Sequence, residues 1–494
     1  MRKVLIANRG EIAVRVIRTC RSMGLSTVAV YSEVDRKALH VLLADEAHAI
    51  GPAAPHSSYL NSDRLLEAAR QTGADAVHPG YGFLSENSDF ARAVIEAGLI
   101  WIGPDPDTID LMGDKVAARR TATEAGVPPV PGADLTGDPA RDLEVARGVG
   151  YPIMVKASGG GGGKGMRVVR DEADLESALE RARNEAGKAF GNAHIYIERA
   201  IESPRHVEVQ LVGDGRGRVA VLGERDCSIQ RRHQKLVEES TCTALTDAAR
   251  RELWDRAAAL AERVQYLGAG TVEFLLAPSG ETFFLEMNTR IQVEHPVTEM
   301  VTGVDLVQQQ ILMARGEPLV LSDRPADLRG HAIECRIGAE DPIHGFLPAA
   351  GVITRLGEPA GPGVRVDSGI HEGFEVGLHY DPLLAKLVVW GATRDEAIER
   401  MAGALEEYDL AGLPTTLPFH RFAMGNRAFR EGRISTDFVG REWKEEAFEA
   451  EPADAVAAAV AAVISRELGR KRRTFDPRGA SPRWWSRREI WRGR

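Results

Sequence analysis

Cysteine and long apolar runs are both scarce in this chain of 494 residues. The four cysteines lie far apart and form no CxxC pair, which argues against a structural zinc site and against a disulfide framework. No apolar run approaches the roughly 18 residues that a membrane-spanning helix needs. We expect no signal peptide either, because Arg2 and Lys3 lead into a short apolar run that ends before Asn8. These absences predict a cytoplasmic protein without a membrane span.

Positive charge is in deficit over the whole chain and is concentrated at its C-terminal end. The formal net charge is −10, which argues against a nucleic-acid-binding protein. Residues 466–494 nevertheless hold eleven Arg and Lys against three acidic residues, together with Trp484, Trp485 and Trp491. We expect this tail to dock onto another subunit or to continue the protein surface, and we disfavour nucleic-acid binding.

The first hundred residues alternate short apolar runs with stretches of helical periodicity. Strands are expected at Val4–Ala7, Thr27–Tyr31, Ala76–His78 and Leu99–Ile102, and helices at Ile12–Met23, Ser62–Thr72 and Asn87–Ala97. Such alternation predicts a parallel sheet covered by helices. The turn after the first strand, Asn8–Glu11, has one glycine where a dinucleotide fingerprint needs three. Residues 1–102 are therefore predicted to form a Rossmann-like domain that does not bind NAD.

The rest of the chain is predicted to divide into four segments. Residues 103–129 are expected to be a connecting region with a helix that is bounded by Gly126 and Pro128. Residues 130–201 are expected to be a compact unit that holds a run of glycines, and residues 202–448 mix strands with helices. Residues 449–494 are interpreted as a C-terminal extension.

Five consecutive glycines, Gly159–Gly163, lie between Lys156 and Lys164. Apolar strand-like runs precede and follow this segment, so it is predicted to be a hairpin flap whose backbone N–H groups can close over phosphates. It is not a Walker A loop, because no G-K-[ST] ends it and a strand follows. A flexible linker is the alternative, but linkers rarely join two apolar strands through lysines.

An alternating segment, Glu286–Glu294, carries the most specific signal in the chain. Polar side chains of Glu286, Asn288, Arg290, Gln292 and Glu294 occupy every second position. In an extended strand they would share one face, with about 6.6–6.8 Å between successive members. This face combines oxygen ligands for a hard cation with an anion receptor, which predicts the floor of an active site.

Glu273 is a carboxylate within the apolar segment Gly270–Phe274. A buried glutamate needs a compensating cation. If Glu286 and Asn288 lie on a neighbouring strand, the simplest such cation is Mg²⁺, which prefers oxygen ligands and shares them with phosphates. A structural pair of Glu273 with an arginine is the alternative.

Two further segments carry weak signals by themselves. Lys115 follows Met112-Gly113-Asp114 and could be an ordinary helix lysine. Tyr196–Ile201 has the pattern of a strand end, where backbone groups could meet adenine. Arg225, Arg231 and Arg232 are equally open to substrate contact and to structural ion pairs.

Taken together, these motifs resemble the ATP-grasp superfamily and, within it, the biotin carboxylase family. The resemblance runs from Val4 to about Phe438, nearly nine-tenths of the chain. It is carried by the motifs Ile6–Ala13, His78–Asn87, Met112–Lys115, the glycine segment, Glu224–Lys235, Glu286–Pro296 and Glu334–Arg336. It implies an α/β ATP-grasp fold with a Rossmann-like N-terminal domain, a mobile glycine-flap lid domain and an α+β C-terminal domain.

The resemblance also implies roles for individual residues in binding ATP and a metal ion. The residues implied at ATP are Lys115, Lys156, Gly162, Gly163, Glu198, Arg199, Ala200, Ile201, His206, Gln230, His233, Glu273 and Glu286. Arg199 stands where the family pattern has lysine, so its contact with the base is expected to differ in geometry. Glu273, Glu286 and Asn288 are the implied ligands of Mg²⁺ or Mn²⁺.

The implied catalytic residues are Arg290, Glu294, Lys235 and Arg336. Lys235, Arg290, Gln292 and Val293 are implied to bind bicarbonate, and Glu294 to remove its proton. Carboxyphosphate would then form and release CO2 and phosphate. Arg336 would stabilise the biotin enolate, and Tyr81 would border the biotin pocket.

The resemblance implies partners as well. Members act on biotin attached to a carrier lysine, and the Ala/Val-Met-Lys-Met attachment motif does not occur here. We therefore expect a separate biotin carboxyl carrier protein, carboxyltransferase subunits and a homodimer. Acetyl-CoA in fatty acid synthesis is the favoured final acceptor, and propionyl-CoA, pyruvate or another acceptor stays open. Two rival hypotheses are another ATP-grasp ligase, which would join a carboxylate to an amine, and a degenerate relative that acts as a scaffold.

Overall fold

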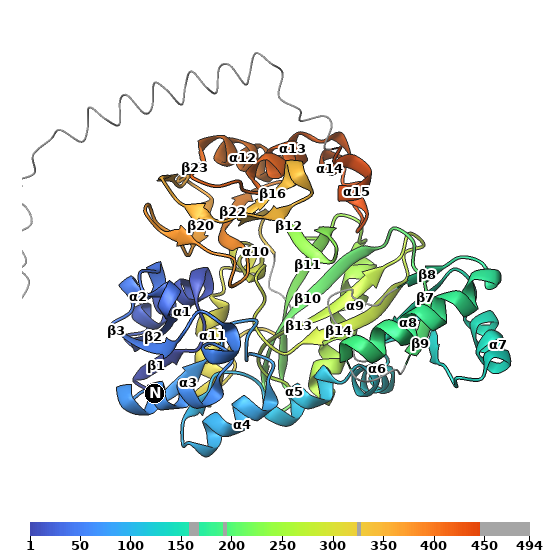
Figure 1. Ribbon diagram of the computed structural model, residues 1–494, viewed down its shortest axis with the longest axis horizontal. Coiled ribbons are helices and arrows are strands. Elements are labelled where there is room, and N and C mark those ends of the chain that lie inside the picture. Colours follow the sequence, from blue (N-terminus) through green and yellow to red (C-terminus); the bar gives the residue numbers. More distant parts are fainter. Residues whose placement is uncertain (158–166, 191–194, 324–327, 445–494) are drawn as a thin grey trace, which may run out of the picture. The chain divides into compact units, whose positions relative to one another are not determined.

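The N-terminal residues form a five-stranded parallel sheet with the strand order β3-β2-β1-β4-β5. Its strands are β1 (Lys3–Ile6), β2 (Ser26–Ser32), β3 (Glu46–Gly51), β4 (Ala76–His78) and β5 (Ile100–Trp101), accompanied by α1 (Gly10–Ser22), α2 (Leu39–Leu43), α3 (Ser62–Thr72) and α4 (Ser88–Glu96). This computed structural model describes residues 1–157, 167–190, 195–323 and 328–444 (Figure 1). The predicted parallel sheet is confirmed. The sequence pattern missed β3, an edge strand without an apolar run.

The connecting region holds two helices, α5 (Pro106–Gly113) and α6 (Lys115–Glu124). The predicted helix before Gly126 is α6, and the sequence pattern missed α5. Asp114 separates them. Its backbone is extended, and its side chain accepts a hydrogen bond from Ala117 N, which caps the start of α6. Lys115 is therefore the first residue of a helix rather than an interior one.

A four-stranded antiparallel sheet follows, with the order β6-β9-β7-β8. Its elements are β6 (Gly132–Asp134), α7 (Pro139–Val149), β7 (Ile153–Ala157), β8 (Arg167–Val169), α8 (Leu175–Phe190) and β9 (Ile195–Arg199). β7 pairs with β8 in an antiparallel register from Ile153↔Val169 to Val155↔Arg167, which confirms the predicted hairpin. Gly162 and Gly163 lie outside the described residues.

An eight-stranded antiparallel sheet, which we call the large sheet, has the order β14-β13-β10-β11-β12-β15-β22-β20. Its strands are β10 (Arg205–Asp214), β11 (Val219–Arg231), β12 (Gln234–Ser240), β13 (Leu267–Leu276), β14 (Thr282–Asn288), β15 (His331–Gly338), β20 (Val364–Ser368) and β22 (Leu383–Gly391). Figure 1 shows β10, β11 and β13 as neighbouring long strands with α9 (Asp247–Arg263) beside them. Leu253, Ala257 and Leu260 of α9 belong to the same buried apolar cluster as Val207 and Val209 of β10.

Further helices and short strands complete the compact unit Met1–Trp443. They are α10 (His295–Thr302), α11 (Leu306–Ala314), β16 (Glu340–Asp341), β17 (Leu347–Pro348), β18 (Gly351–Val352), β19 (Arg355–Gly357), β21 (Glu375–Val376), α12 (Arg394–Glu407), β23 (Asp409–Ala411), α13 (Leu417–Gly425), α14 (Arg427–Arg430) and α15 (Phe438–Glu442). The predicted tail, with Trp484, Trp485 and Trp491, lies outside the described residues.

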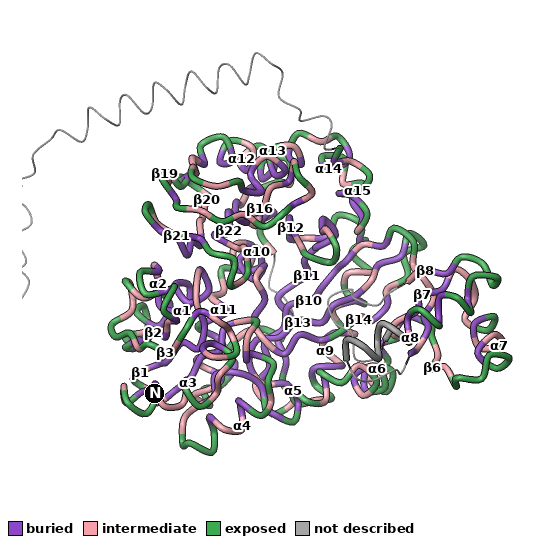
Figure 2. Tube along the Cα trace, in the orientation of Figure 1, coloured by how far each residue is buried: buried purple, intermediate pink, exposed green. Residues whose placement is uncertain are grey.

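Burial is most continuous in the middle of the large sheet (Figure 2). In β11 every residue from Val219 to Gln230 is buried, including the charged side chains of Glu224, Arg225 and Asp226. Charges buried this deeply must compensate one another. In the part of the chain that the structure describes, no helix is long and apolar enough to cross a membrane.

The expectation of one extended strand from Glu286 to Glu294 was wrong, because β14 ends at Asn288. Beyond that point the backbone leaves the ladder. Thr289 N donates to Glu86 Oε1 at 3.0 Å instead of to a neighbouring strand. Glu294 then occupies the N-cap position of α10. The alternation after Asn288 therefore reflects a loop with polar side chains on one side, and the regular two-residue spacing does not extend to it.

Backbone packing in the large sheet leads to a test at Gly213. A Cβ atom at Gly213, in β10, would lie 2.0 Å from the backbone oxygen of Tyr266, which cannot move aside without shifting the chain. We expect Gly213→Ala to lower the free energy of unfolding by about 1–3 kcal/mol. Gly403 in α12 is the matched control, since a Cβ there meets nothing within 4 Å. Gly403→Ala should raise the free energy of unfolding by up to about 1 kcal/mol. Urea unfolding of both variants measures this, and equal effects would contradict the packing argument.

Candidate active site

A cleft of about 840 Å³ is lined by residues of the N-terminal segment, α6, the four-stranded sheet and the large sheet. Most of the predicted site residues line it: Tyr81, Lys115, Lys156, Glu198, His206, Gln230, His233, Lys235, Glu273, Glu286, Asn288, Arg290, Gln292, Val293, Glu294 and Arg336. These residues are spread over more than 250 positions of sequence. The fold thus brings together what the motifs indicated separately.

Three predicted nucleotide contacts do not line this cleft. The Arg199 guanidinium lies 5.1 Å from the centre of the Phe283 ring and 3.7 Å from a carboxylate oxygen of Glu281. Ala200 N donates to Pro152 O at 2.8 Å, and Ile201 packs against the small apolar cluster that contains Phe283. Their assignment to adenine stays a prediction, as does the assignment of Gly162 and Gly163 to phosphate.

A row of charged side chains crosses four neighbouring strands of the large sheet. Arg225 in β11 is opposite Glu208 in β10, Glu208 is opposite Glu273 in β13, and Glu273 is opposite Glu286 in β14. Like charges directly opposite each other on a sheet repel. Three adjacent carboxylates therefore need cations on the same face, and the side chains around the row supply most of them.

Lys235 is the first of these cations. Its Nζ donates to Glu208 Oε2 at 2.6 Å, to Glu273 Oε1 at 2.9 Å and to Glu294 Oε1 at 2.6 Å. An ammonium group has three N–H donors, so all three are directed at carboxylates. Lys235 thus connects the row of acids to Glu294, which lies at the start of α10.

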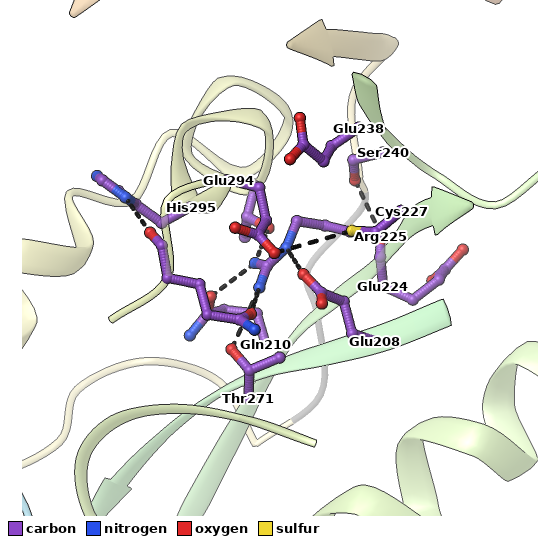
Figure 3. A network of polar contacts seen from close by, with 12 residues as sticks. Glu208, Gln210, Glu224, Arg225, Cys227, Glu238, Ser240, Thr271, Glu294 and His295 are labelled. Atoms are coloured by element: carbon purple, nitrogen blue, oxygen red, sulfur yellow. Dashed lines mark hydrogen bonds and ion pairs between the residues drawn. The ribbon is translucent and has the colours of Figure 1, made fainter. Parts of the chain in front are cut away.

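Arg225 is the second cation, and its side chain is completely buried. Its guanidinium donates to Glu208 Oε1 at 2.5 Å, Gln210 Oε1 at 2.6 Å and Gln292 Oε1 at 2.7 Å, as well as to the hydroxyls of Thr271 and Thr298. Figure 3 shows it at the centre of this network. Of the two roles left open for Arg225, the structural ion pair is the observed one. Arg225 also fixes Gln292, a predicted bicarbonate contact.

Glu294 is held between two cations. Lys235 bonds to one carboxylate oxygen at 2.6 Å, and the Arg336 guanidinium donates to the other at 2.9 Å. Burial raises the pKa of Glu294, but the positive charges of Lys235, Arg336 and Arg225 outweigh it and lower that pKa well below its usual range. Glu294 is therefore ionised at neutral pH, as a general base must be.

The residues predicted to bind Mg²⁺ fit a divalent cation. Glu273 and Glu286 lie opposite each other, and Asn288 Nδ2 donates to Glu273 Oε1 at 2.9 Å. Lys235 and His206 compensate Glu273, whereas no ion pair to Glu286 is found within residues 1–157, 167–190, 195–323 and 328–444. The cleft walls desolvate Glu286 and Glu273 repels it, so its pKa is raised. Glu286 and the Asn288 amide lie beside Glu273, whose charge is already compensated. Together these side chains form an oxygen donor set that suits Mg²⁺.

Three cations gather where α6 and β7 line the cleft. Lys115 and Arg119 are four residues apart on α6, and Lys156 lies on β7. Desolvation, Arg119 and Lys115 lower the pKa of Lys156 to about 8. Glu198 forms ion pairs with both Arg119 and Lys156. A cluster of this kind favours a polyanion such as a phosphate chain.

The chain matches three family models over consecutive regions. Residues 1–109 match the biotin carboxylase N-terminal domain, residues 114–322 the carbamoyl-phosphate synthase L chain ATP binding domain, and residues 334–441 the biotin carboxylase C-terminal domain. A biotin carboxylase of Nostoc sp. is 53% identical over 438 residues, which cover 88% of this chain and 98% of the relative. The chain belongs to the biotin carboxylase family.

Solved structures agree with this assignment to the biotin carboxylase family. A biotin carboxylase–β,γ-ATP complex from Campylobacter jejuni has a TM-score of 0.86 and 45% identity, and the match covers 89% of this chain and 99% of that chain. The biotin carboxylase domain dimer of 2-oxoglutarate carboxylase from Hydrogenobacter thermophilus, solved with MgADP, ADP and bicarbonate, has a TM-score of 0.84 and 47% identity, with coverages of 89% and 97%. The predicted ATP-grasp fold class is confirmed, and the chain is an ATP-dependent ligase of the biotin carboxylase type.

Four cleft or near-cleft residues of this biotin carboxylase family member were missed from the sequence. Glu208 and Glu238 are acids within apolar strands, the same signal that drew attention to Glu273. Arg119 follows Lys115 by four residues, which places both on one face of a helix. Glu86 binds Arg290 Nε at 2.9 Å, a contact across 204 positions that no local pattern indicates.

Two buried glutamates behind the site differ in their charge. Glu334 is opposite Glu238 in the β12–β15 register, and among the described residues neither of its carboxylate oxygens has a hydrogen-bond partner. Burial raises the pKa of Glu334 well above its usual range, with Glu238 adding repulsion that Lys386 offsets. Burial also raises the pKa of Glu239, but His331 and Arg394 outweigh it and lower that pKa to about 2.

This contrast predicts opposite effects of the same substitution. Folded Glu334 keeps a proton that the unfolded chain loses near its ordinary pKa of 4.5, so its stabilising contribution is full below that pH and is lost as pH rises. Glu334→Gln is neutral at every pH and should therefore gain stability relative to the unmodified protein as pH rises. Glu239 contributes stability above pH 4.5 that is lost as pH falls towards 2, so Glu239→Gln should lose about 3 kcal/mol at neutral pH.

Urea unfolding of both variants between about pH 5 and about pH 8 measures these differences. A Glu334→Gln variant that becomes less stable than the unmodified protein with rising pH would show that Glu334 is ionised in the fold.

Proposed function

We propose that this enzyme carboxylates biotin on a biotin carboxyl carrier protein, consuming ATP and bicarbonate and giving ADP and phosphate through carboxyphosphate. One observation carries the proposal. An ionised Glu294 lies between Lys235 and Arg336, within a cleft that also holds a phosphate-type cation cluster. A base, an anion site and a polyanion site in one cleft suit the deprotonation of bicarbonate next to ATP.

At the nucleotide end, Lys115 and Lys156 are proposed to neutralise the ATP phosphates. His206, Gln230 and His233 line the same cleft and are proposed to surround the nucleotide together with Glu198. The flap glycines Gly162 and Gly163 and the strand-end residues Arg199, Ala200 and Ile201 are assigned by family resemblance alone.

Glu273, Glu286 and Asn288 are proposed to hold Mg²⁺ or Mn²⁺. When bound, the ion would neutralise phosphate charge as phosphoryl transfer proceeds. Without it, Glu273 is still held in place, because it accepts hydrogen bonds from Asn288, Gln292 and Lys235.

Arg290, Gln292, Val293 and Lys235 are proposed to bind bicarbonate. Glu86 bonds Arg290 at Nε, and Asn288 accepts from its Nη2 at 2.8 Å, so the guanidinium is held at the cleft. A planar guanidinium can donate two parallel hydrogen bonds to a carboxylate-like anion. Glu294 would then take the bicarbonate proton, which produces a stronger nucleophile towards the γ-phosphate.

Arg336 and Tyr81 are proposed to contact biotin. Carboxyphosphate would break down to CO2 and phosphate in the closed site, and that phosphate would accept the proton from the ureido nitrogen. Arg336 donates to Glu238 at 2.5 Å and to Glu294 at 2.9 Å, which orients its guanidinium. A fixed positive charge there would stabilise the developing enolate oxygen.

The wider assembly follows from the family. We propose that the enzyme works with carboxyltransferase subunits as the first half-reaction of an acyl-CoA carboxylase, with acetyl-CoA as the acceptor. A homodimer is proposed as well, since one similar structure is described as a domain dimer. Among biotin carboxylase relatives the acceptor differs, as the 2-oxoglutarate carboxylase shows.

One assay separates this proposal from another ATP-grasp ligase and from an inactive scaffold. ATP hydrolysis with Mg²⁺ is measured with and without bicarbonate and with and without free biotin. We expect turnover that depends on bicarbonate and is stimulated by biotin, because carboxyphosphate forms before biotin reacts. ATP turnover indifferent to bicarbonate would favour another ligase, and no turnover at all would favour a scaffold.

Glu294→Gln tests the base. The substitution keeps the size of the side chain but removes its ability to accept a proton, so kcat for biotin carboxylation should fall by about 10²–10⁴-fold. ATP affinity, measured by calorimetry, should stay within about twofold, since Glu294 does not belong to the phosphate cluster. Glu406→Gln, at an exposed glutamate of α12 that does not line the cleft, is the control and should change neither quantity. Equal losses of ATP affinity and turnover in Glu294→Gln would count against the assigned role.

A further inference from the structure

Lys386 is a buried lysine of β22 whose charge offsets the repulsion at Glu334 and which has no part in the proposed function. Its side chain has no solvent exposure. Nζ donates to the backbone oxygen of Val293 at 2.9 Å and lies 3.1 Å from Glu11 Oε2. A strand of the C-terminal part of the chain therefore reaches the loop that carries the predicted bicarbonate residues.

Glu11 extends this contact to the N-terminal sheet. It lies in the first turn of α1, is buried, and accepts a hydrogen bond from the Tyr81 hydroxyl through its other carboxylate oxygen. The backbones also approach closely here, because a Cβ at Gly369 would lie 2.6 Å from Glu11 N. Tyr81, Glu11, Lys386 and the Val293 carbonyl thus form one continuous chain of polar contacts.

The bond to Val293 is not required for charge compensation. Glu11 already supplies a carboxylate to Lys386, and Asp367, 3.9 Å away, is bonded twice by Arg365. The ammonium nevertheless directs a hydrogen bond at a carbonyl between Gln292 and Glu294. A peptide plane is rigid. Fixing the Val293 carbonyl therefore also fixes the direction of the peptide bond that leads to Glu294.

We propose that Lys386 is a positioning residue. It fixes the loop of residues 289–293, which carries the proposed bicarbonate contacts, and couples this loop through Glu11 to Tyr81, where biotin is proposed to bind. This inference rests on the proposed function. Lys386 touches no substrate in this arrangement. It acts through the Val293 peptide. Biotin bound beside Tyr81 would act on the same peptide through Tyr81, Glu11 and Lys386.

The experiment uses the full chain and compares Lys386→Met with Arg394→Met. Arg394 is the matched control, because it is a mostly buried cation of the C-terminal part that bonds Glu239 and backbone oxygens away from the cleft. We expect Lys386→Met to raise KM for bicarbonate about fivefold or more, the loss expected from one buried hydrogen bond. KM for MgATP should stay within about twofold in both variants.

A buried Glu11 without its cation could prevent Lys386→Met from folding, so a second variant is included. Glu11→Gln/Lys386→Met removes both charges together and should show the same rise in KM for bicarbonate. A thermodynamic cycle tests the coupling. Tyr81→Phe should raise KM for bicarbonate in the unmodified enzyme and leave it unchanged in the Lys386→Met or double-variant background.

The outcomes are distinguishable. An unmodified enzyme without bicarbonate-dependent ATP turnover overturns the proposed function and this inference with it. An enzyme with that dependence, in which Lys386→Met raises KM for bicarbonate no more than Arg394→Met does, overturns the inference alone. An equal rise of KM for bicarbonate and KM for MgATP in Lys386→Met also overturns the inference, because it would indicate only a loosened fold.

Discussion

The arrangement of this enzyme depends on the compensation of three acids that lie side by side on one sheet. Glu208, Glu273 and Glu286 occupy directly opposite positions on β10, β13 and β14. Such a row is unstable by itself, because adjacent buried carboxylates repel and lose their hydration. Lys235 and Arg225 compensate two of the three from the same face. Lys235 and Arg225 must lie beside this row of acids, and their positions determine the arrangement of side chains around them.

The same compensation determines the chemistry. Lys235 has one more donor than Glu208 and Glu273 require, and this donor reaches Glu294. Arg225 likewise has donors left for Gln292. Residues that neutralise the sheet therefore also orient the Glu294 carboxylate and the Gln292 amide. The third acid, Glu286, forms no ion pair within residues 1–157, 167–190, 195–323 and 328–444, which is why the metal site is expected at that end.

Part of this could be predicted from sequence, and the reason is local. Glu273 and Glu286 were identified as partners because each is an acid in a strand-like segment, and the β13–β14 register places them opposite each other. The parallel N-terminal sheet followed from the alternation of apolar runs and helices. The predicted extension of β14 to Glu294 was wrong. An alternating pattern indicates which side chains meet polar surroundings, but it does not indicate whether the strand stays paired with its neighbour. Glu86, which draws Thr289 and Arg290 out of the strand, comes from a distant loop. The functions of Arg225 and Lys386 depend on contacts with three or more distant segments, and no periodicity encodes those.

The large sheet has a consequence for how the chain can be divided. Family models end one region at residue 322 and begin the next at residue 334, yet β12 pairs with β15 across that boundary from Val237↔Cys335 to Ser240↔Ala332. A fragment that stopped at the boundary would leave β12 as a bare edge, with Glu238 facing water instead of Arg336 and with unpaired backbone groups open to other chains. The two regions match separate family models, but they share one sheet and fold as one unit. Any transplant of this ATP-binding region into another protein would have to bring β15 and β22 with it.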